Sequence, residues 1–277
     1  MNTYEDLLRS SIRAAGSVLC VGLDPDLHKL RDSWQRQGES DAACVERFCK
    51  ATIAATSDLA SSYKPNLAFF EVLGRDGLRV FGEVCDAIPS GRLIIADAKR
   101  GDIGNTADRY ATTFLEVFDC DAITLSPLMG LETLNAFTTR ADKAVYVLTL
   151  TSNPGADDFL GQPAAEYPSL AELIAHKLGN YDHVRPAHVG MVIGATRPAA
   201  ISPLLKAHPA GGLLLPGIGA QGGTVESLIQ ALDGHQGVPV VPISRGILFG
   251  TDANADGIRQ RAAMYHSMLH SLSQAYV

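Results

Sequence analysis

The chain has 277 residues, of which 46% are hydrophobic and 19% are charged, and its formal net charge is −7. This composition excludes a disordered chain, which would be poorer in apolar residues, and the acidic balance argues against a nucleic-acid binder that uses a broad basic face. The length suits one α/β barrel domain, which usually has about 250 residues. No apolar run reaches the roughly 20 residues of a membrane-spanning helix, so no membrane association is expected.

Short apolar runs alternate with longer amphipathic stretches along the whole chain. The N-terminal residues have helical spacing, and residues 17–23 predict a first buried strand. Further strands are predicted over residues 63–70, 92–96, 122–125, 144–150, 187–193, 212–215 and 238–243. Helices are predicted over residues 41–60, 75–88, 105–118, 130–138, 164–178, 198–207, 224–232 and 253–274. Asn105 or Thr106 is the expected N-cap of the helix that starts there, and residues 28–39 and 153–167 are predicted to be loops or insertions.

These elements make about eight strand-then-helix units with an extra helix in front. Strict alternation of strand and helix implies a parallel sheet. Eight such units favour a closed (β/α)8 or TIM barrel over an open doubly wound sheet. No linker or fixed repeat divides the chain, so residues 1–277 are expected to form a single α/β domain. Barrel enzymes place their chemistry where strands end, which directs attention to the polar residues after each apolar run.

The segment after the third predicted strand carries the sharpest candidates. In an extended chain side chains alternate, so Asp97 and Lys99 are expected to point the same way. Lys64 on the neighbouring strand and Asp102 would complete a neutral set of two carboxylates and two ammonium groups, as buried charges require. A catalytic interpretation is favoured because a cavity readily perturbs the pKa values of such groups. A structural ion-pair network is the alternative.

A glycine-rich turn over residues 216–223, which includes Gln221 and Gly222, follows the seventh strand, and Arg245 follows the eighth. Glycines let backbone N–H groups approach an anion, and a guanidinium can grip phosphate oxygens in a bidentate manner. Loops in these two positions form the recurrent phosphate site of this barrel type. The pattern therefore predicts a phosphorylated substrate, with a plain tight turn as the alternative.

Other candidates are weaker when taken alone. Asp24 at the end of the first strand could bind ligand hydroxyls or cap a turn, and both readings stay open. Ser152 is explained more readily by the turn that follows it than by a ligand contact. No arrangement of His, Asp or Glu resembles a metal site. Five cysteines without a CxxC pair favour free thiols in a reducing compartment, so the protein is predicted to be cytoplasmic.

Residues 97–102, continued by Ile103 and Thr106, resemble the signature of the orotidine 5′-phosphate decarboxylase family. The resemblance extends in order to Asp24, Lys64 with Pro65-Asn66, Ser152 with Asn153-Pro154-Gly155, residues 216–223, and Arg245. These blocks span most of the chain, which looks like the longer bacterial branch of the family. Arg100-Gly101 and the two predicted loops depart from the shorter members, which leaves the loop contacts open.

The resemblance implies cofactor-free and metal-free decarboxylation of orotidine 5′-phosphate to UMP, the last step of de novo pyrimidine synthesis. Lys99 would protonate C6 of the pyrimidine, flanked by Asp97 and Asp102, while Lys64 completes the charge array. The implied binding residues are Asp24 and Lys64 for the ribose, Thr151, Ser152 and Gln221 for the pyrimidine, and Gln221, Gly222 and Arg245 for the phosphate. In this family the counterparts of Asp102, Ile103 and Thr106 enter the site from the other subunit of a homodimer.

Two other readings compete with this one. A Mg²⁺-dependent sugar-phosphate decarboxylase of the same barrel superfamily resembles the chain at the third strand. Such relatives place an acidic metal ligand where this sequence has Lys64, and a cation there repels Mg²⁺. A non-enzymatic nucleotide-binding barrel would be expected to have lost Lys99 or a carboxylate of the charged set, and all are present.

Overall fold

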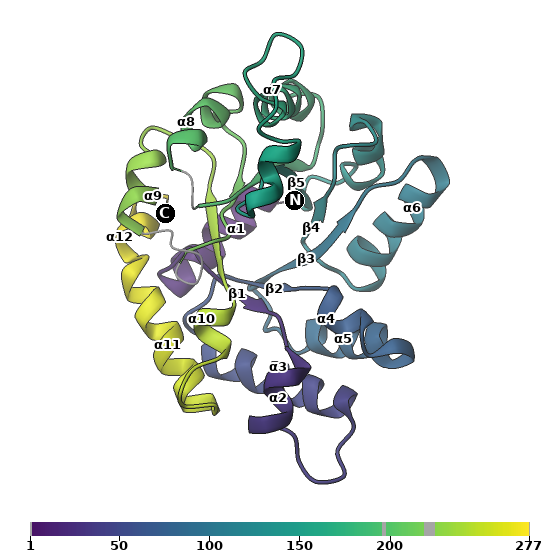
Figure 1. Ribbon diagram of the computed structural model, residues 1–277, viewed down its shortest axis with the longest axis vertical. Helices are drawn as coiled ribbons and strands as arrows, with labels where there is room; N and C mark the ends of the chain where they lie inside the picture. Colours follow the sequence, from purple (N-terminus) through teal and green to yellow (C-terminus); the bar gives the residue numbers. More distant parts are fainter. Residues whose placement is uncertain (1, 196–197, 219–224, 277) are drawn as a thin grey trace. The chain divides into compact units, whose positions relative to one another are not determined.

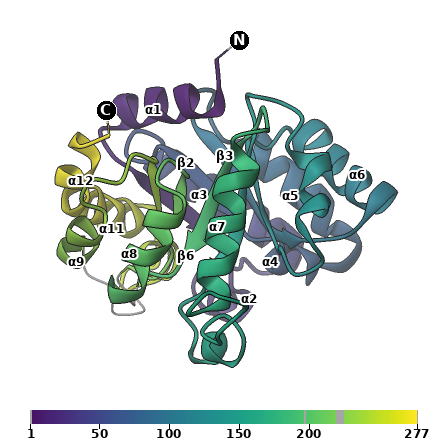
Figure 2. The same ribbon diagram turned by 90° about the horizontal axis from the view of Figure 1, so that it is seen from above.

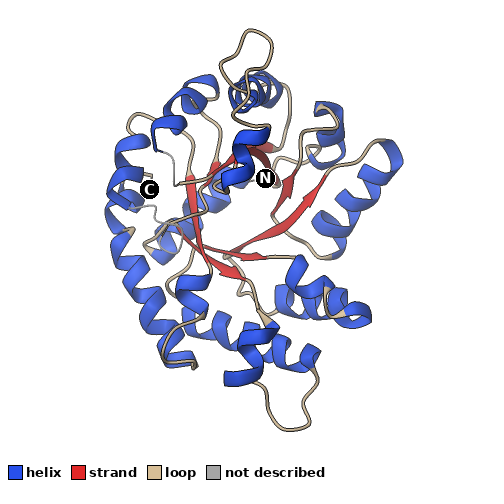
Figure 3. Ribbon diagram, in the orientation of Figure 1, coloured by secondary structure: helices blue, strands red, loops and turns tan. Residues whose placement is uncertain are grey.

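The computed structural model describes residues 2–195, 198–218 and 225–276. Eight parallel strands close into a barrel in the order β1 to β8, and helices alternate with them along the chain (Figure 3). The strands are β1 (Leu19–Leu23), β2 (Ser62–Pro65), β3 (Leu93–Arg100), β4 (Ala122–Leu125), β5 (Ala144–Leu150), β6 (His188–Ile193), β7 (Leu213–Leu214) and β8 (Pro239–Ile243). Every residue of β1, β4 and β8 is buried, as parallel strands covered by helices require. The predicted (β/α)8 barrel is thus confirmed.

The chain divides into two compact units, which are described separately. Unit one comprises Met1–Arg9 and Lys99–Val241, and unit two comprises Ser10–Ala98 and Pro242–Val277. The helix α1 (Tyr4–Ala15) and the strands β3 and β8 each run from one unit into the other along the chain. The helices of unit two are α2 (Leu27–Ser33), α3 (Asp41–Thr56), α4 (Ala68–Glu71), η1 (Gly74–Asp76), α5 (Gly77–Asp86), α10 (Arg245–Leu248), α11 (Ala255–Met268) and α12 (His270–Gln274). The helices of unit one are α6 (Gly104–Thr112), η2 (Thr113–Val117), η3 (Leu131–Phe137), η4 (Pro154–Asp158), α7 (Leu170–Asp182), α8 (Pro198–Ala207) and α9 (Val225–Ala231).

Unit two joins the first strand region of the chain to its last helices. The helix α11 lies against α3 (Figure 1). Arg259 of α11 forms a bidentate pair with Asp58, with N–O distances of 2.8 and 2.7 Å. The backbone N–H of Val18 donates to Ser273 Oγ of α12 at 2.9 Å. Residues about 200 to 255 positions apart therefore hold this unit together.

Unit one has its helices α7 and α8 side by side (Figure 2), with β6 paired to β5 and β7. The imidazole of His188 packs between two neighbours at the start of β6. Its Nε2 accepts the backbone N–H of Gly212 at 2.9 Å, and its ring stacks on Tyr4 at 5.9 Å. A Cβ at Gly212 would lie 2.2 Å from that nitrogen, so only glycine fits there. Burial lowers the pKa of His188, more than Asp182 raises it.

Several predicted boundaries are wrong for local reasons. Residues 28–39 were expected to be a loop or an insertion, and they include most of α2, whose N-cap Asp26 accepts the N–H of His28 at 3.0 Å. The second strand ends at Pro65 instead of residue 70, and α4 follows it. Residues 153–167 include the short helix η4, and α7 begins only at Leu170, after the N-cap Ser169.

The helical prediction for residues 105–118 also needs correction. The N-cap of α6 is Ile103, with no capping side-chain hydrogen bond, so neither Asn105 nor Thr106 serves as the cap. The helix ends at Thr112 and continues as the π-helical turn η2. The predicted helix over residues 253–274 is split into α11 and α12. Residues 130–138 form the 3₁₀ helix η3.

All five cysteines are buried and none forms a disulfide: Cys20, Cys44, Cys49, Cys85 and Cys120. Burial raises the pKa of the Cys20 thiol to about 12. Buried thiols with raised pKa values carry little thiolate and react slowly. Within the described ranges, none of the helices has the length and hydropathy needed to cross a bilayer.

Candidate active site

A buried ion pair joins the carboxyl end of β2 to β3 within unit two. Lys64 Nζ lies 2.6 Å from Asp97 Oδ2, and both side chains are about one-tenth exposed, at 9% and 10%. Burial alone lowers the pKa of Lys64, but the charges of Asp97 and Asp24 outweigh it and raise that pKa above its usual value. Lys64 is therefore a fully charged ammonium at neutral pH, as the predicted pairing of these two residues requires.

Two polar atoms of unit two at the ends of β1 and β8 have no hydrogen-bond partner among the described residues. They are Asp24 Oδ1 and Ser244 Oγ, and both atoms are buried. The strands approach closely here, since a Cβ on Gly22 would lie 2.8 Å from Ser244 Cβ. A buried polar atom left unpaired costs free energy, so these two atoms are available to hydrogen-bond a ligand.

Lys99 begins unit one at the end of β3, where the backbone changes conformation. Its φ is +48°, in the left-handed region, and its side chain is exposed. The alternation argument assumed an extended backbone at Lys99, and that assumption is wrong. Its backbone N–H donates to the hydroxyl of Thr124 on β4 at 3.0 Å. The backbone of Lys99 is thus hydrogen-bonded to a neighbouring strand, which the sequence spacing did not reveal.

The dipeptide Arg100-Gly101 contacts the end of β4 and the helices α6 and η2. The carbonyl of Arg100 accepts the N–H of Ser126 at 2.8 Å. The guanidinium of Arg100 lies over the rings of Tyr110 and Phe114, with centroid distances of 5.3 and 5.7 Å. A Cβ on Gly101 would lie 3.0 Å from the carbonyl oxygen of Ser126, which explains a glycine at this position.

Asp102, Ile103 and Thr106 lie at the start of α6. Asp102 is half-buried, and its Oδ1 accepts the backbone N–H of Ile103 at 2.8 Å. Ile103 is 56% exposed, and Thr106 is exposed as well. An apolar side chain and a carboxylate therefore stand together on the surface of unit one.

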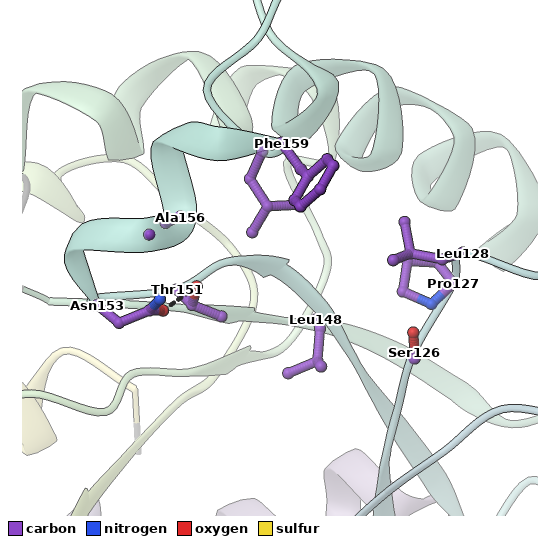
Figure 4. Close-up of a pocket in the computed structure, with 10 residues that line it drawn as sticks. Ser126, Pro127, Leu128, Leu148, Thr151, Asn153, Ala156 and Phe159 are labelled. Atoms are coloured by element: carbon purple, nitrogen blue, oxygen red, sulfur yellow. Dashed lines mark hydrogen bonds between the residues drawn. The ribbon is translucent and has the colours of Figure 1, made fainter.

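Thr151 lines a pocket of about 170 Å³ beyond the ends of β4 and β5 (Figure 4). The Thr151 hydroxyl donates to Asn153 Oδ1 at 2.7 Å. The other lining residues are Ser126, Pro127, Leu128, Leu148, Asn153, Gly155, Ala156, Phe159 and Leu160. Ser152 is half-buried and is not among them, and a Cβ on Gly194 would lie 2.8 Å from its Cβ. The mostly apolar walls and the few polar atoms at the rim suit a flat ring with polar edges.

The expected phosphate residues are only partly described. Arg245 opens the four-residue helix α10 directly after β8, and its side chain is exposed. In the glycine-rich turn, Gly217 has φ +114°, a conformation that favours glycine. Gln221 and Gly222 lie outside the described residues.

Sequence reasoning missed Thr124, Ser126 and Ser244. Thr124 accepts a hydrogen bond from the neighbouring strand, Ser126 lines the pocket, and Ser244 carries an unpartnered hydroxyl, and nothing in the local pattern distinguishes these residues. Among the residues that the structure describes, no group of three His, Cys, Asp or Glu side chains is arranged to hold a metal ion.

Comparison with known proteins gives matches over most of the chain. Residues 17–256 match the model of the orotidine 5′-phosphate decarboxylase / HUMPS family. An orotidine 5′-phosphate decarboxylase of Herpetosiphon aurantiacus is 41% identical over 253 residues, which are 89% of this chain and 90% of that protein. A putative orotidine-monophosphate-decarboxylase of Toxoplasma gondii has a crystal structure with a TM-score of 0.88 and 31% identity, covering 99% of this chain and 97% of its own. The UMP synthase of Leishmania donovani has a TM-score of 0.85 and 35% identity; the match covers 99% of this chain but only 57% of that longer protein.

Proposed function

The chain belongs to the orotidine 5′-phosphate decarboxylase / HUMPS family, and from this premise we propose that it decarboxylates orotidine 5′-phosphate to UMP. The observation that carries the proposal is the match to a decarboxylase along 90% of that relative's length. The buried Lys64–Asp97 pair supports it, because this pair supplies half of the charge array expected from the signature.

We propose that Lys99 supplies the proton. The bond between C6 and the carboxylate breaks, CO₂ leaves, and the electron pair stays on C6. A preorganised ammonium stabilises this carbanion and then protonates it, so that the C6–H bond forms and Lys99 is left neutral. The exposure of the Lys99 side chain supports this role, because water can return the proton after each turnover.

The Lys64–Asp97 pair would act on the substrate carboxylate and ribose. Asp97 beside the carboxylate disfavours the ground state through like-charge repulsion, which is relieved when CO₂ departs. The ammonium of Lys64, 2.6 Å from Asp97 Oδ2, holds that carboxylate in place, and the charge of Asp24 also acts on this ammonium. Asp24 and Lys64 are proposed to bind the ribose hydroxyls, and the unpartnered Asp24 Oδ1 supports the assignment because it can accept one.

Pyrimidine and phosphate contacts follow from the family resemblance. Thr151 and Ser152 would contact the pyrimidine, and the pocket beside Thr151 supports a ring at that edge. Gln221, the Gly222 backbone and Arg245 would hold the phosphate. The phosphate lies far from C6, and its binding energy is expected to support the reaction by closing loops over the substrate.

We propose that the protein forms a homodimer in which each active site contains residues of both subunits. Asp102, Ile103 and Thr106 would enter the partner's site, as the resemblance implies. The exposed apolar Ile103 next to Asp102 supports this assignment, because an exposed isoleucine gains stability when a second subunit covers it. The buried free thiols fit a reducing compartment, so we also propose a cytoplasmic location.

The test is an absorbance assay for loss of orotidine 5′-phosphate in the presence of EDTA. Wild type should remain fully active, Lys99→Ala should be inactive, and the control Lys177→Ala, an exposed residue on α7, should match wild type. Activity that disappeared with EDTA and returned with Mg²⁺ would favour the metal-dependent sugar-phosphate alternative. Activity in Lys99→Ala would remove Lys99 from its role.

A further inference from the structure

The backbone of Lys99 has a conformation that an L-residue rarely adopts. Its φ of +48° is one of three positive values among the described non-glycine residues, the others being at Asp119 and Ala165. Such a conformation costs free energy and persists only when the surroundings impose it. A contact must therefore hold the residue that carries the proposed proton donor.

The hydroxyl of Thr124 provides that contact. Thr124 Oγ1 accepts the backbone N–H of Lys99 at 3.0 Å, and Thr124 itself is only 1% exposed. The threonine is fixed by its strand, since β4 pairs with β5 in register with Thr124 opposite Tyr146. The bond ties the backbone of Lys99 to β4 at the point where β3 leaves its extended conformation.

The next two residues are held to the same strand. Ser126 donates its backbone N–H to the Arg100 carbonyl at 2.8 Å, and Gly101 approaches the Ser126 backbone too closely for a Cβ to fit freely. The contacts that tie residues 99–101 to the segment 124–126 therefore include three of different kinds: the bond to the Thr124 hydroxyl, the backbone bond from Ser126 and the close approach of Gly101. Of these three, only the hydroxyl bond can be removed by a substitution that keeps the shape of the side chain.

We propose that Thr124 is a positioning residue for Lys99: its hydroxyl holds the left-handed backbone of Lys99 and so sets where the Lys99 ammonium stands relative to C6. The inference rests on the proposed function, in which Lys99 is the acid. It predicts an effect on the chemical step and little effect on substrate binding, because Thr124 acts through Lys99 and not on the ligand. It also requires the hydroxyl and not merely a side chain of that volume.

The test compares Thr124→Val, which keeps the shape and removes the hydroxyl, with Thr124→Ser, which keeps the hydroxyl. Thr124→Val should lower kcat roughly 10- to 100-fold, the scale of a displacement of about 1 Å, with KM and UMP affinity changed less than threefold. Thr124→Ser should keep kcat within threefold of wild type. If circular dichroism shows Thr124→Val to be unfolded, Thr124→Ala replaces it. A hydroxyl-free variant with kcat within threefold of wild type, or a serine variant as slow as the valine variant, would overturn the inference.

A second measurement separates this inference from the proposed function. Amide hydrogen exchange at Lys99, measured without substrate, should be at least tenfold faster in Thr124→Val than in wild type and near wild type in Thr124→Ser. If wild type does not decarboxylate orotidine 5′-phosphate, the proposed function fails, and the exchange data still decide whether Thr124 holds Lys99. Equal exchange in wild type and Thr124→Val would refute the hydroxyl contact, whatever the activity.

Discussion

Removing the charge of Asp97 should destabilise the fold strongly, because it takes the ion-pair partner from a buried ammonium. The carboxylate lies 2.6 Å from Lys64 Nζ, and the Lys64 side chain is 9% exposed, so water cannot replace it. Loss of one partner of a buried pair costs about 3–5 kcal/mol. Asp24 still attracts Lys64 in the variant, so we expect Asp97→Asn to lose the lower amount, about 3 kcal/mol of the free energy of unfolding.

Urea unfolding at pH 7, followed by circular dichroism and by fluorescence of the single tryptophan Trp34, measures this loss. With a slope of roughly 3 kcal/mol per molar urea, the midpoint should fall by about 1 M. The matched control Asp86→Asn changes an exposed carboxylate on α5 and should stay within about 0.5 kcal/mol of wild type. An Asp97→Asn protein as stable as that control would refute the reasoning that the pair is buried and mutually dependent.

The same variant should acquire a distinctive pH dependence. Burial lowers the pKa of Lys64, and the charge of Asp97 is the largest influence that raises it. Without Asp97, the folded-state pKa should fall below the unfolded value near 10.4, so the unfolded chain binds more protons between the two values. Stability of Asp97→Asn should therefore rise with pH across that window, relative to wild type.

Three further results are expected. Arg245→Ala should raise KM roughly tenfold or more, which is the scale of a charge-assisted hydrogen bond. Phosphite dianion should accelerate the reaction of a phosphate-free substrate much less in the variant than in wild type. Equal acceleration in both would remove Arg245 from the site. Lys99→Ala and Asp102→Ala homodimers should be mixed and allowed to exchange subunits. If each active site is built from both subunits, the mixture should recover about a quarter of wild-type activity, because half of the dimers are then heterodimers with one intact site of two. A mixture that exchanges subunits and stays inactive would contradict the shared site. Because burial lowers the pKa of His188, the His188 contribution to the free energy of unfolding should be fully present above about pH 6.5 and should fall by about 1 kcal/mol per pH unit below it. Thermal melts at pH 7.5 and 5.5 would detect this loss.

The alternation of apolar runs and amphipathic stretches was enough to predict the barrel, since each buried strand of a parallel barrel is a short uninterrupted apolar run. Strands β4 and β5 match their predicted ranges residue for residue. The errors lie where short-range and tertiary effects compete. Residues 68–70 are apolar enough for a strand, yet the chain turns into α4 after Pro65. The cap of α6 is Ile103, because tertiary contacts of the preceding segment decide where that helix begins.

The site was predictable to the extent that charge must be balanced. Lys64 and Asp97 were expected to pair on the ground that neither can be buried alone, and they do. The conformation of Lys99 was not predictable, since alternation holds only while the backbone stays extended. The positive φ of Lys99 and its contact with the Thr124 hydroxyl arise only when the strands are assembled. No local sequence pattern predicts them.

Unit two is built from two segments that lie far apart in the sequence, and this affects how the chain folds during synthesis on the ribosome. Its first segment, Ser10–Ala98, packs against residues after Pro242, as the Asp58–Arg259 pair and the bond from Val18 to Ser273 illustrate. The 143 intervening residues (241 − 99 + 1) take roughly 7 to 30 s to translate at about 5–20 residues per second. During that time the apolar surface of α3 that α11 later covers has no native partner. The nascent chain must therefore wait, exposed to aggregation and to chaperones, until its last helices have left the ribosome.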